Sequence, residues 1–170
     1  PQYTDVELKV YLWGLQVFGK DQGEYLSTPA LIGENGDRIC WFEFLEKAKS
    51  IFDRYGDIPF VHWHVYEKTC LKAYIERHGD PGSIAQRVQD NLLDLHPIIK
   101  GSIALPVPSY SLKVVEKYAG YSRTQEEYGG EWSIAKYIEA VETENKEERE
   151  ELLDEIVKYN KDDLEATWAV

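Results

Sequence analysis

The sequence predicts an α/β domain with a mixed central sheet flanked by helices. Short extended segments joined by turns open the chain, which favours antiparallel strands. The hydrophobic period then changes to that of a helix, and a short apolar run between helices indicates a buried strand. The length of 170 residues fits one core, so we expect a single domain over residues 1–170.

The first part of the chain alternates extended segments with turns. Lys9 to Phe18 is apolar and aromatic, and Glu24 to Ile32 resumes the extended pattern after a turn at residues 20–23. A second turn follows at residues 33–37. Strands joined by such short turns predict an antiparallel meander.

Helices dominate the middle of the chain. Apolar residues from Trp41 to Tyr55 step by four and three, which predicts a helix that Gly56 ends. Ile58 to His64 is typical of a buried strand, and residues 67–78 are expected to form the next helix. A further helix is indicated by the spacing of Ile84, Val88, Leu92 and Leu95.

The C-terminal part is predicted to contain a loop, a short helix and a long helix. Two prolines make residues 105–108 a loop, and residues 111–118 form the short helix. Asn145 followed by Glu148 resembles a capping box at the start of the long helix. Asn160 interrupts its expected buried stripe of Leu152, Ile156, Leu164 and Trp168.

Composition limits the classes of protein that fit. A net charge of −12 argues against broad binding of nucleic acid by a basic surface, although a metal-dependent site needs clustered carboxylates. Nothing is long and apolar enough to span a bilayer, and Cys40 and Cys70 are expected to be reduced, partly buried thiols. We therefore expect a cytoplasmic protein and, because the chain begins at Pro1 without Met, a fragment of a longer one.

Two pairs of residues are candidates for metal chemistry. Asp5 and Glu7 are two apart near a strand, so their carboxylates would share one face and could bridge two Mg²⁺ or Mn²⁺ ions. Tyr159 and Asp163 are four apart on the last helix, so the acid could hold a metal while the tyrosine positions water. An ordinary acidic surface and a core tyrosine remain the alternatives.

The junction near residue 65 contains further candidates. His62 and His64 are two apart on the predicted strand and could bind zinc, but no third ligand is evident. Local packing or hydrogen bonding is the alternative for both histidines. Glu67 follows at the start of a helix, which favours its ionised form.

The order of these acids resembles that of the DEDD exonucleases, which have an RNase H-like fold. Four blocks are similar to the RNase H-like domain of predicted RecB-family nucleases. Residues 60–72 resemble its His-Tyr-x-x-Tyr-Glu block, and residues 94–96 resemble Asp-Leu-Tyr. Residues 108–113 resemble Ser-Tyr-Ser-Leu-Lys, and residues 159–163 resemble Tyr-Asn-x-Asp-Asp.

This resemblance implies an RNase H-like fold and a two-metal nuclease site. The implied ligands of two Mg²⁺ or Mn²⁺ ions are Asp5, Glu7, Glu67 and Asp163. Tyr159 would act on the water, Asp94 would be an additional acid, and Ser111 and Lys113 would contact a phosphate. One departure is that Leu8 follows the Asp-x-Glu motif at once, where the family has a loop of several residues.

We therefore expect a 3′–5′ exonuclease that acts on DNA by a two-metal mechanism. A RecB-like nuclease or helicase domain would be its neighbour in the longer protein. The alternative is a catalytically silent RNase H-like module that binds nucleic acid or a partner protein. A structural acidic domain in which every motif is coincidental is a third hypothesis.

Overall fold

A computed structural model describes residues 9–19, 23, 25–29, 35–124 and 129–170. Asp5 and Glu7 lie outside these residues. The strands are β1 (Leu12–Leu15), β2 (Leu26–Pro29), β3 (Phe60–His62) and β4 (Leu92–Asp94). The α-helices of the described part are α1 (Gly36–Tyr55), α2 (Tyr66–His78), α3 (Ile84–Asp90), α4 (Leu95–Ser102), α5 (Leu112–Tyr118), α6 (Gly130–Glu142) and α7 (Lys146–Ala169). A short 3₁₀ turn, Pro81–Ser83, precedes α3.

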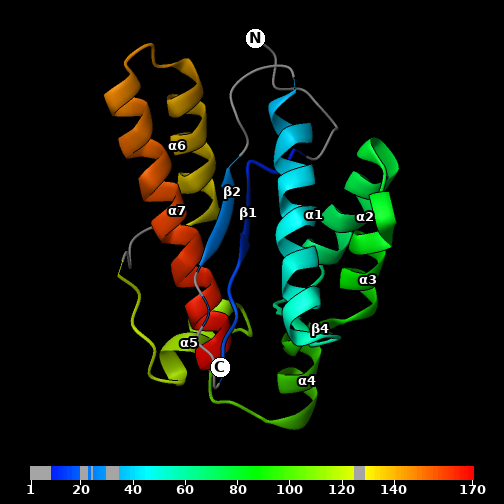
Figure 1. Ribbon diagram of the computed structural model, residues 1–170. Helices are drawn as coiled ribbons and strands as arrows, with labels where there is room; N and C mark the ends of the chain where they lie inside the picture. Colours follow the sequence, from blue (N-terminus) through cyan, green and yellow to red (C-terminus); the bar gives the residue numbers. More distant parts are fainter. Residues whose placement is uncertain (1–8, 20–22, 24, 30–34, 125–128) are drawn as a thin grey trace.

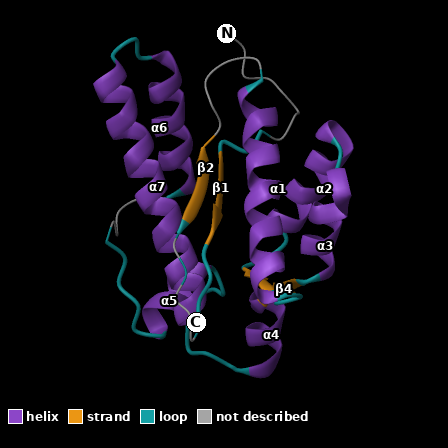
Figure 2. Cartoon of the chain, in the orientation of Figure 1, coloured by secondary structure: helices purple, strands orange, loops and turns teal. Residues whose placement is uncertain are grey.

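Helices cover the β1–β2 pair on both sides. Figure 1 shows α6 and α7 on one side of this pair and α1 on the other, with α2 and α3 beyond α1. Helix α5 lies under the C-terminal half of α7 (Figure 1). Figure 2 shows the same arrangement by secondary structure. No helix within the described ranges combines the length and the apolar character that crossing a membrane requires.

Strands β1 and β2 form an antiparallel pair, as the sequence predicts. Trp13 lies opposite Thr28 in the register, and both side chains are buried. Gly14 is the point where α7 approaches the strand, because a Cβ built there would lie 1.9 Å from Oδ1 of Asn160. The glycine therefore lets a helix pack directly on β1.

Strands β3 and β4 form a separate parallel pair. His62 lies opposite Asp94 in this register. The expected mixed sheet requires both antiparallel and parallel pairing. The described residues contain both kinds of pairing, but in two separate two-stranded sheets. The part of the chain described here adds no strand that joins them.

The helix predicted through Leu92 and Leu95 is wrong. Helix α3 ends at Asp90, residues 92–94 form β4, and α4 begins at Leu95. Asp94 ends the strand and begins the helix, because its side chain accepts a hydrogen bond from the His96 N–H at 3.0 Å. Short apolar runs fit a strand and a helix equally well, so their period could not decide between the two.

Helices α1, α2 and α7 were predicted, unlike α6, and their ends have local causes. Gly56 and Gly79 end α1 and α2 in backbone conformations with φ of +73° and +83°. Asn145 caps α7 by accepting the Glu147 N–H at 3.0 Å. Glu148 instead contacts the Thr143 hydroxyl, so only half of the predicted capping box forms.

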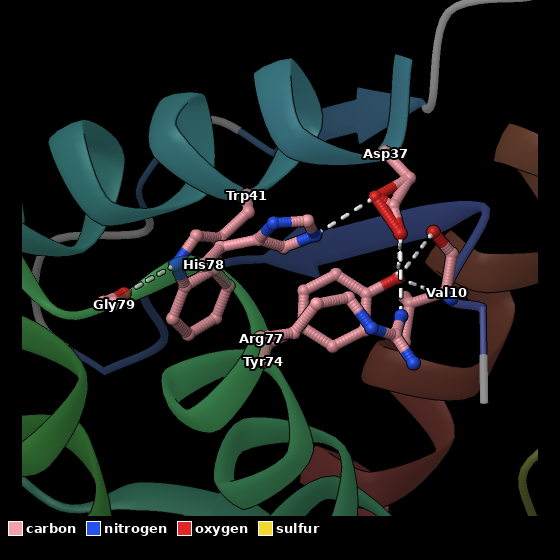
Figure 3. Close-up of polar contacts among 7 residues, drawn as sticks. All are labelled: Val10, Asp37, Trp41, Tyr74, Arg77, His78 and Gly79. Atoms are coloured by element: carbon pink, nitrogen blue, oxygen red, sulfur yellow. Dashed lines mark hydrogen bonds and ion pairs between the residues drawn. The ribbon is translucent and has the colours of Figure 1, made fainter. Parts of the chain in front are cut away.

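An aromatic cluster between α1, α2 and β1 forms the core. Trp41 is fully buried, and its indole N–H donates to the Gly79 carbonyl at 2.9 Å (Figure 3). Trp13 and Tyr74 lie against it with ring centroids at 5.4 Å in both pairs. Trp168 was expected in the core but is 58% exposed and stacks on Phe18 at the end of α7.

Candidate functional site

Tyr159 and Asp163 lie together on one face of α7, next to Arg123. The Arg123 Nη1 atom is 2.6 Å from Asp163 Oδ1, and the guanidinium lies 5.6 Å from the centre of the Tyr159 ring. The Lys113 ammonium lies 5.6 Å from the same ring centre. The two α7 residues therefore share their surroundings, as their spacing of four predicts.

Arg123 is held in place by Glu116 of α5. Its Nε and Nη2 atoms donate to Oε1 and Oε2 of Glu116 at 2.6 and 2.8 Å, and the two side chains are only 3% and 1% exposed. This bidentate pair fixes the guanidinium. Neither residue was identified from the sequence, because the partners come from separate segments.

Burial changes the acid–base properties of the α7 pair. Burial raises the pKa of Tyr159 to about 12, with Asp163 adding to the rise and Arg123 opposing it. The phenol is therefore protonated at neutral pH and can donate a hydrogen bond. Burial also raises the pKa of Asp163, although Arg123 and Lys113 oppose that rise.

Asp162, the neighbour of Asp163, has a structural role. It is buried, and its Oδ2 accepts the Thr124 N–H at 3.0 Å and the Thr124 hydroxyl at 2.8 Å. Asp162 is therefore not an ordinary solvated acid of the helix surface. The contact holds the segment that follows Arg123 against α7.

A second cluster lies where β3 leads into α2. Glu67 is in the first turn of α2, and its Oε2 lies 3.3 Å from His62 Nδ1. Neither atom makes a hydrogen bond within the described residues. Burial lowers the pKa of His62, but Glu67 and Asp94 more than offset this effect, so the pKa is raised. The histidine is therefore a positive partner for Glu67 at mildly acidic pH.

The neighbouring histidines do not gather around a common centre with Glu67. His64 has a φ of +71°, and its N–H donates to Asp94 Oδ1 at 2.8 Å. Its ring meets the His96 ring edge-on, with centroids at 4.7 Å. Over the described residues, no group of three His, Cys, Asp or Glu could hold a metal ion. Asp94 accepts hydrogen bonds from the backbone of both His64 and His96, so it connects the turn after β3 with the start of α4.

Strand β1 lies between the two clusters. The Tyr11 hydroxyl donates to Ser133 Oγ at 3.0 Å, and its pKa is raised by burial and further by Asp163. Tyr11 in turn adds to the raised pKa of Tyr66, the residue before Glu67. The electrostatic surroundings of Tyr11 therefore include both α7 and α2.

A third polar cluster fixes the start of β1 and was not predicted (Figure 3). Asp37, in the first turn of α1, lies 3.3 Å from Arg77 Nη1 and 3.0 Å from His78 Nε2. The Tyr74 hydroxyl lies 3.3 Å from Asp37 Oδ2 and accepts the Val10 N–H at 2.6 Å. These contacts join α1, α2 and the residue that leads into β1, so their role is to position the strand.

Fold and site together describe an α/β protein with acidic side chains on α2 and α7, on either side of β1. The chain belongs to the RNase H superfamily, whose family model matches residues 3–170. Members of this superfamily generally hydrolyse phosphodiester bonds, usually with divalent metal ions. No curated protein and no solved structure matches the chain. The match confirms the RNase H-like prediction at the level of the superfamily.

The described acids offer the kind of ligand that Mg²⁺ and Mn²⁺ prefer. Both ions bind carboxylate oxygens, and the Glu67 and Asp163 side chains are 46% and 36% exposed. Arg123 pairs with Oδ1 of Asp163. The chemistry of these two groups therefore fits a hard divalent cation.

Proposed function

We propose that the chain is a divalent-metal-dependent nuclease, acting as a 3′–5′ exonuclease on DNA. The proposal is carried by a partly exposed Asp163 beside a buried, protonated Tyr159 in a chain of the RNase H superfamily. Glu67 and Asp163, together with Asp5 and Glu7, would hold two Mg²⁺ or Mn²⁺ ions. These ions would supply an activated water and stabilise the leaving oxygen.

The residues around α7 have separate roles in this proposal. Tyr159 keeps its proton and orients the attacking water through a hydrogen bond. Lys113, which interacts with Asp163 electrostatically, contacts a phosphate oxygen, with Ser111 beside it at the start of α5. Glu67 contributes from the opposite side of β1.

The distance along the chain supports the inclusion of the first motif. Glu7 is four residues before Tyr11, so an extended chain keeps its Cα within about 14 Å of Tyr11. By the same rule Asp5 stays within about 21 Å. Tyr11 immediately precedes β1, so the length of the chain allows both acids to reach a site beside that strand.

Cleavage of end-labelled DNA and RNA with Mn²⁺ or Mg²⁺ tests the proposal. Asp163→Asn keeps the size of the side chain but removes its charge, so metal-dependent cleavage should fall by roughly 100-fold or more. Asp154→Asn is the matched control, because this exposed acid lies on the same helix outside the cluster. Full cleavage by Asp163→Asn would mean that the site is wrongly assigned.

The position of the label determines direction and substrate. A 3′–5′ exonuclease shortens a 5′-labelled strand through a ladder and releases the label of a 3′-labelled strand as a mononucleotide. An endonuclease instead gives internal fragments from both. Preference for DNA is tested by comparing the cleavage rates of DNA and RNA strands of the same sequence. Equal rates would contradict the proposal that the substrate is DNA.

A catalytically silent module that binds nucleic acid is the second candidate. The observation that favours it is the Arg123 guanidinium, a permanent cation 2.6 Å from Asp163 Oδ1 that already compensates the carboxylate. Calorimetric titration with Mn²⁺ separates the two candidates. A nuclease site should bind the ion in the millimolar range or more tightly, whereas a silent module should give no saturable heat.

A further inference from the structure

A positively charged pocket lies beside α5. Its volume is about 350 Å³, and it is lined by Lys113, Val114, Glu116, Lys117 and Arg123. Three cations and one carboxylate line it, and the Asp163 carboxylate lies against Arg123, so one positive charge remains in excess. This local excess occurs in a chain whose net charge is −12, so the pocket is a place where an anion can approach.

Arg123 forms part of the pocket wall and is held by two carboxylates. Its Nε and Nη2 atoms are bound to Glu116, but Nη1 is buried without a hydrogen bond in the described residues. The 2.6 Å contact of Nη1 with Asp163 is therefore an ion pair without hydrogen-bond alignment. Since Glu116 and Asp163 keep the buried guanidinium in place, Arg123 contributes a fixed positive charge to the wall of the pocket.

Two lysines extend the pocket along α5. Lys113 and Lys117 are four residues apart, so they lie on one face of the helix. Lys113 also faces the Tyr159 ring and interacts with Asp163, which connects the pocket to the proposed catalytic acid. The exposed Lys117 lies one turn further away from these residues.

We propose that this pocket binds a backbone phosphate of the nucleic-acid strand whose scissile bond lies at Asp163. The exposed Lys117 contacts the phosphate, the buried Arg123 attracts it by its fixed positive charge, and Lys113 lies between Lys117 and Asp163. A phosphodiester carries one negative charge and oxygens that accept from both ammonium and guanidinium groups. The inference rests on the proposed nuclease function and adds the subsite that holds the strand.

Binding of a labelled single-stranded DNA of about 12 nucleotides tests the subsite. Fluorescence anisotropy in EDTA at several NaCl concentrations measures binding by the full chain without metal-dependent cleavage. Lys117→Ala should weaken binding about five-fold and reduce the salt slope by about 0.7, the value for one phosphate contact on a single strand. Lys117→Glu should weaken binding further.

The matched control is Lys72→Ala, which removes an exposed lysine from α2, on the other side of the β1–β2 pair from α5 (Figure 1). This variant should bind as the unmodified chain does. If Lys117→Ala and Lys72→Ala have the same affinity and salt slope, the pocket does not hold the strand. Lys117 is exposed, so loss of the fold is not expected, and circular dichroism verifies this.

A second arm separates a strand phosphate from a free phosphate ion. Inorganic phosphate is titrated into each variant by calorimetry at constant ionic strength. If Lys117→Ala lowers the heat of phosphate binding but leaves strand binding unchanged, the ligand is a free phosphate and the strand proposal fails. Weaker strand binding in Lys117→Ala supports it.

The subsite and the nuclease function fail in distinguishable ways. If Asp163→Asn stops cleavage while the Lys117 variants bind normally, the nuclease proposal stands and the subsite is wrong. If the Lys117 variants bind weakly while no metal supports cleavage, the subsite stands and the nuclease proposal is wrong.

Discussion

Glu116 and Arg123 are the least exposed ion pair among the described residues. Removing one partner of a buried pair leaves the other charge uncompensated. Glu116→Gln should therefore lower the free energy of unfolding by about 3 kcal/mol, measured by urea denaturation. The loss should occur even though Asp163 remains near the guanidinium, because that contact has no hydrogen-bond alignment.

The exposed pair Lys49–Asp53 provides the control for this effect. Its atoms are 2.6 Å apart, as in the buried pair, but both side chains are more than half exposed. Water and salt screen such a pair, so Lys49→Ala should leave the unfolding curve unchanged. Equal losses in the two variants would contradict a role for burial.

The two cysteines should be protected by the folded state. Burial raises the pKa of Cys40 to about 12 and that of Cys70 to about 11, so both thiols are neutral at pH 8. Thiolate is the reactive form, and labelling with an aromatic disulfide reagent should be no faster than unfolding. Rapid labelling of both thiols in the absence of denaturant would contradict their burial.

The same shifts determine how stability changes with pH. Each folded-state pKa exceeds 9.0, the ordinary pKa of a cysteine thiol, so the unfolded chain loses these protons first. The contribution to stability is fully present below pH 9 and is lost as the pH rises toward 11 for Cys70 and 12 for Cys40. Substituting both residues with Ser should reduce this alkaline loss of stability.

At the scale of elements, the predictions succeeded where a long apolar period was present in the sequence. Helix α1 repeats its apolar period over 20 residues, which gives a pattern that a strand cannot produce. β4 has only three residues, and Leu92 and Leu93 fit either period. Helix α6 was not predicted, because it begins at Gly130 and its side chains supply few buried apolar positions.

Contacts between distant segments explain what could not be predicted of the site. The pairing of Tyr159 with Asp163 is local, because four residues make one turn of a helix. Arg123 reaches Asp163 only because α5 packs under α7, and no period in the sequence contains that information. The cluster around Asp37 likewise depends on how α1 packs on α2.

Gly14 connects β1 to α7, and its replacement tests that packing. Gly14→Ala would bring Cβ against Asn160 Oδ1, which accepts the Tyr25 hydroxyl at 2.8 Å. The Asn160 side chain must then move and lose this bond, so stability should fall by about 1–3 kcal/mol in urea denaturation. This hydrogen bond also explains the polar residue in the apolar stripe of α7.

Gly101→Ala is the control for Gly14→Ala, because it adds a methyl group where there is space for one. Gly101 lies in α4, and nothing is within 4 Å of a Cβ built there. Alanine favours the helix, so stability should stay the same or rise by about 0.5 kcal/mol. A loss as large as that of Gly14→Ala would mean that loss of glycine flexibility, rather than contact with α7, causes the effect.

For the whole molecule, which carries a net charge of −12, added salt should affect stability and strand binding in opposite directions. A group of mostly exposed acids lies on the first half of α7: Glu147, Glu148, Glu150, Glu151, Asp154 and Glu155. NaCl screens their repulsion, so raising it from about 20 to about 300 mM should raise the melting temperature. The same salt should weaken the binding of a strand at the α5 pocket.

Mn²⁺ can raise the melting temperature of an acidic chain either by screening the repulsion between its carboxylates or by binding at a specific site. The two effects must be measured separately. At ionic strength matched with NaCl, only an ion that binds the folded state should raise the melting temperature further. A concentration ten times the dissociation constant should add about 4 °C for a chain of this size. Asp163→Asn should lose this increment but keep the response to NaCl, whereas Asp154→Asn should keep both. If Mn²⁺ and matched NaCl stabilise the unmodified chain equally, the carboxylates act only as surface charge and the silent module is the better interpretation.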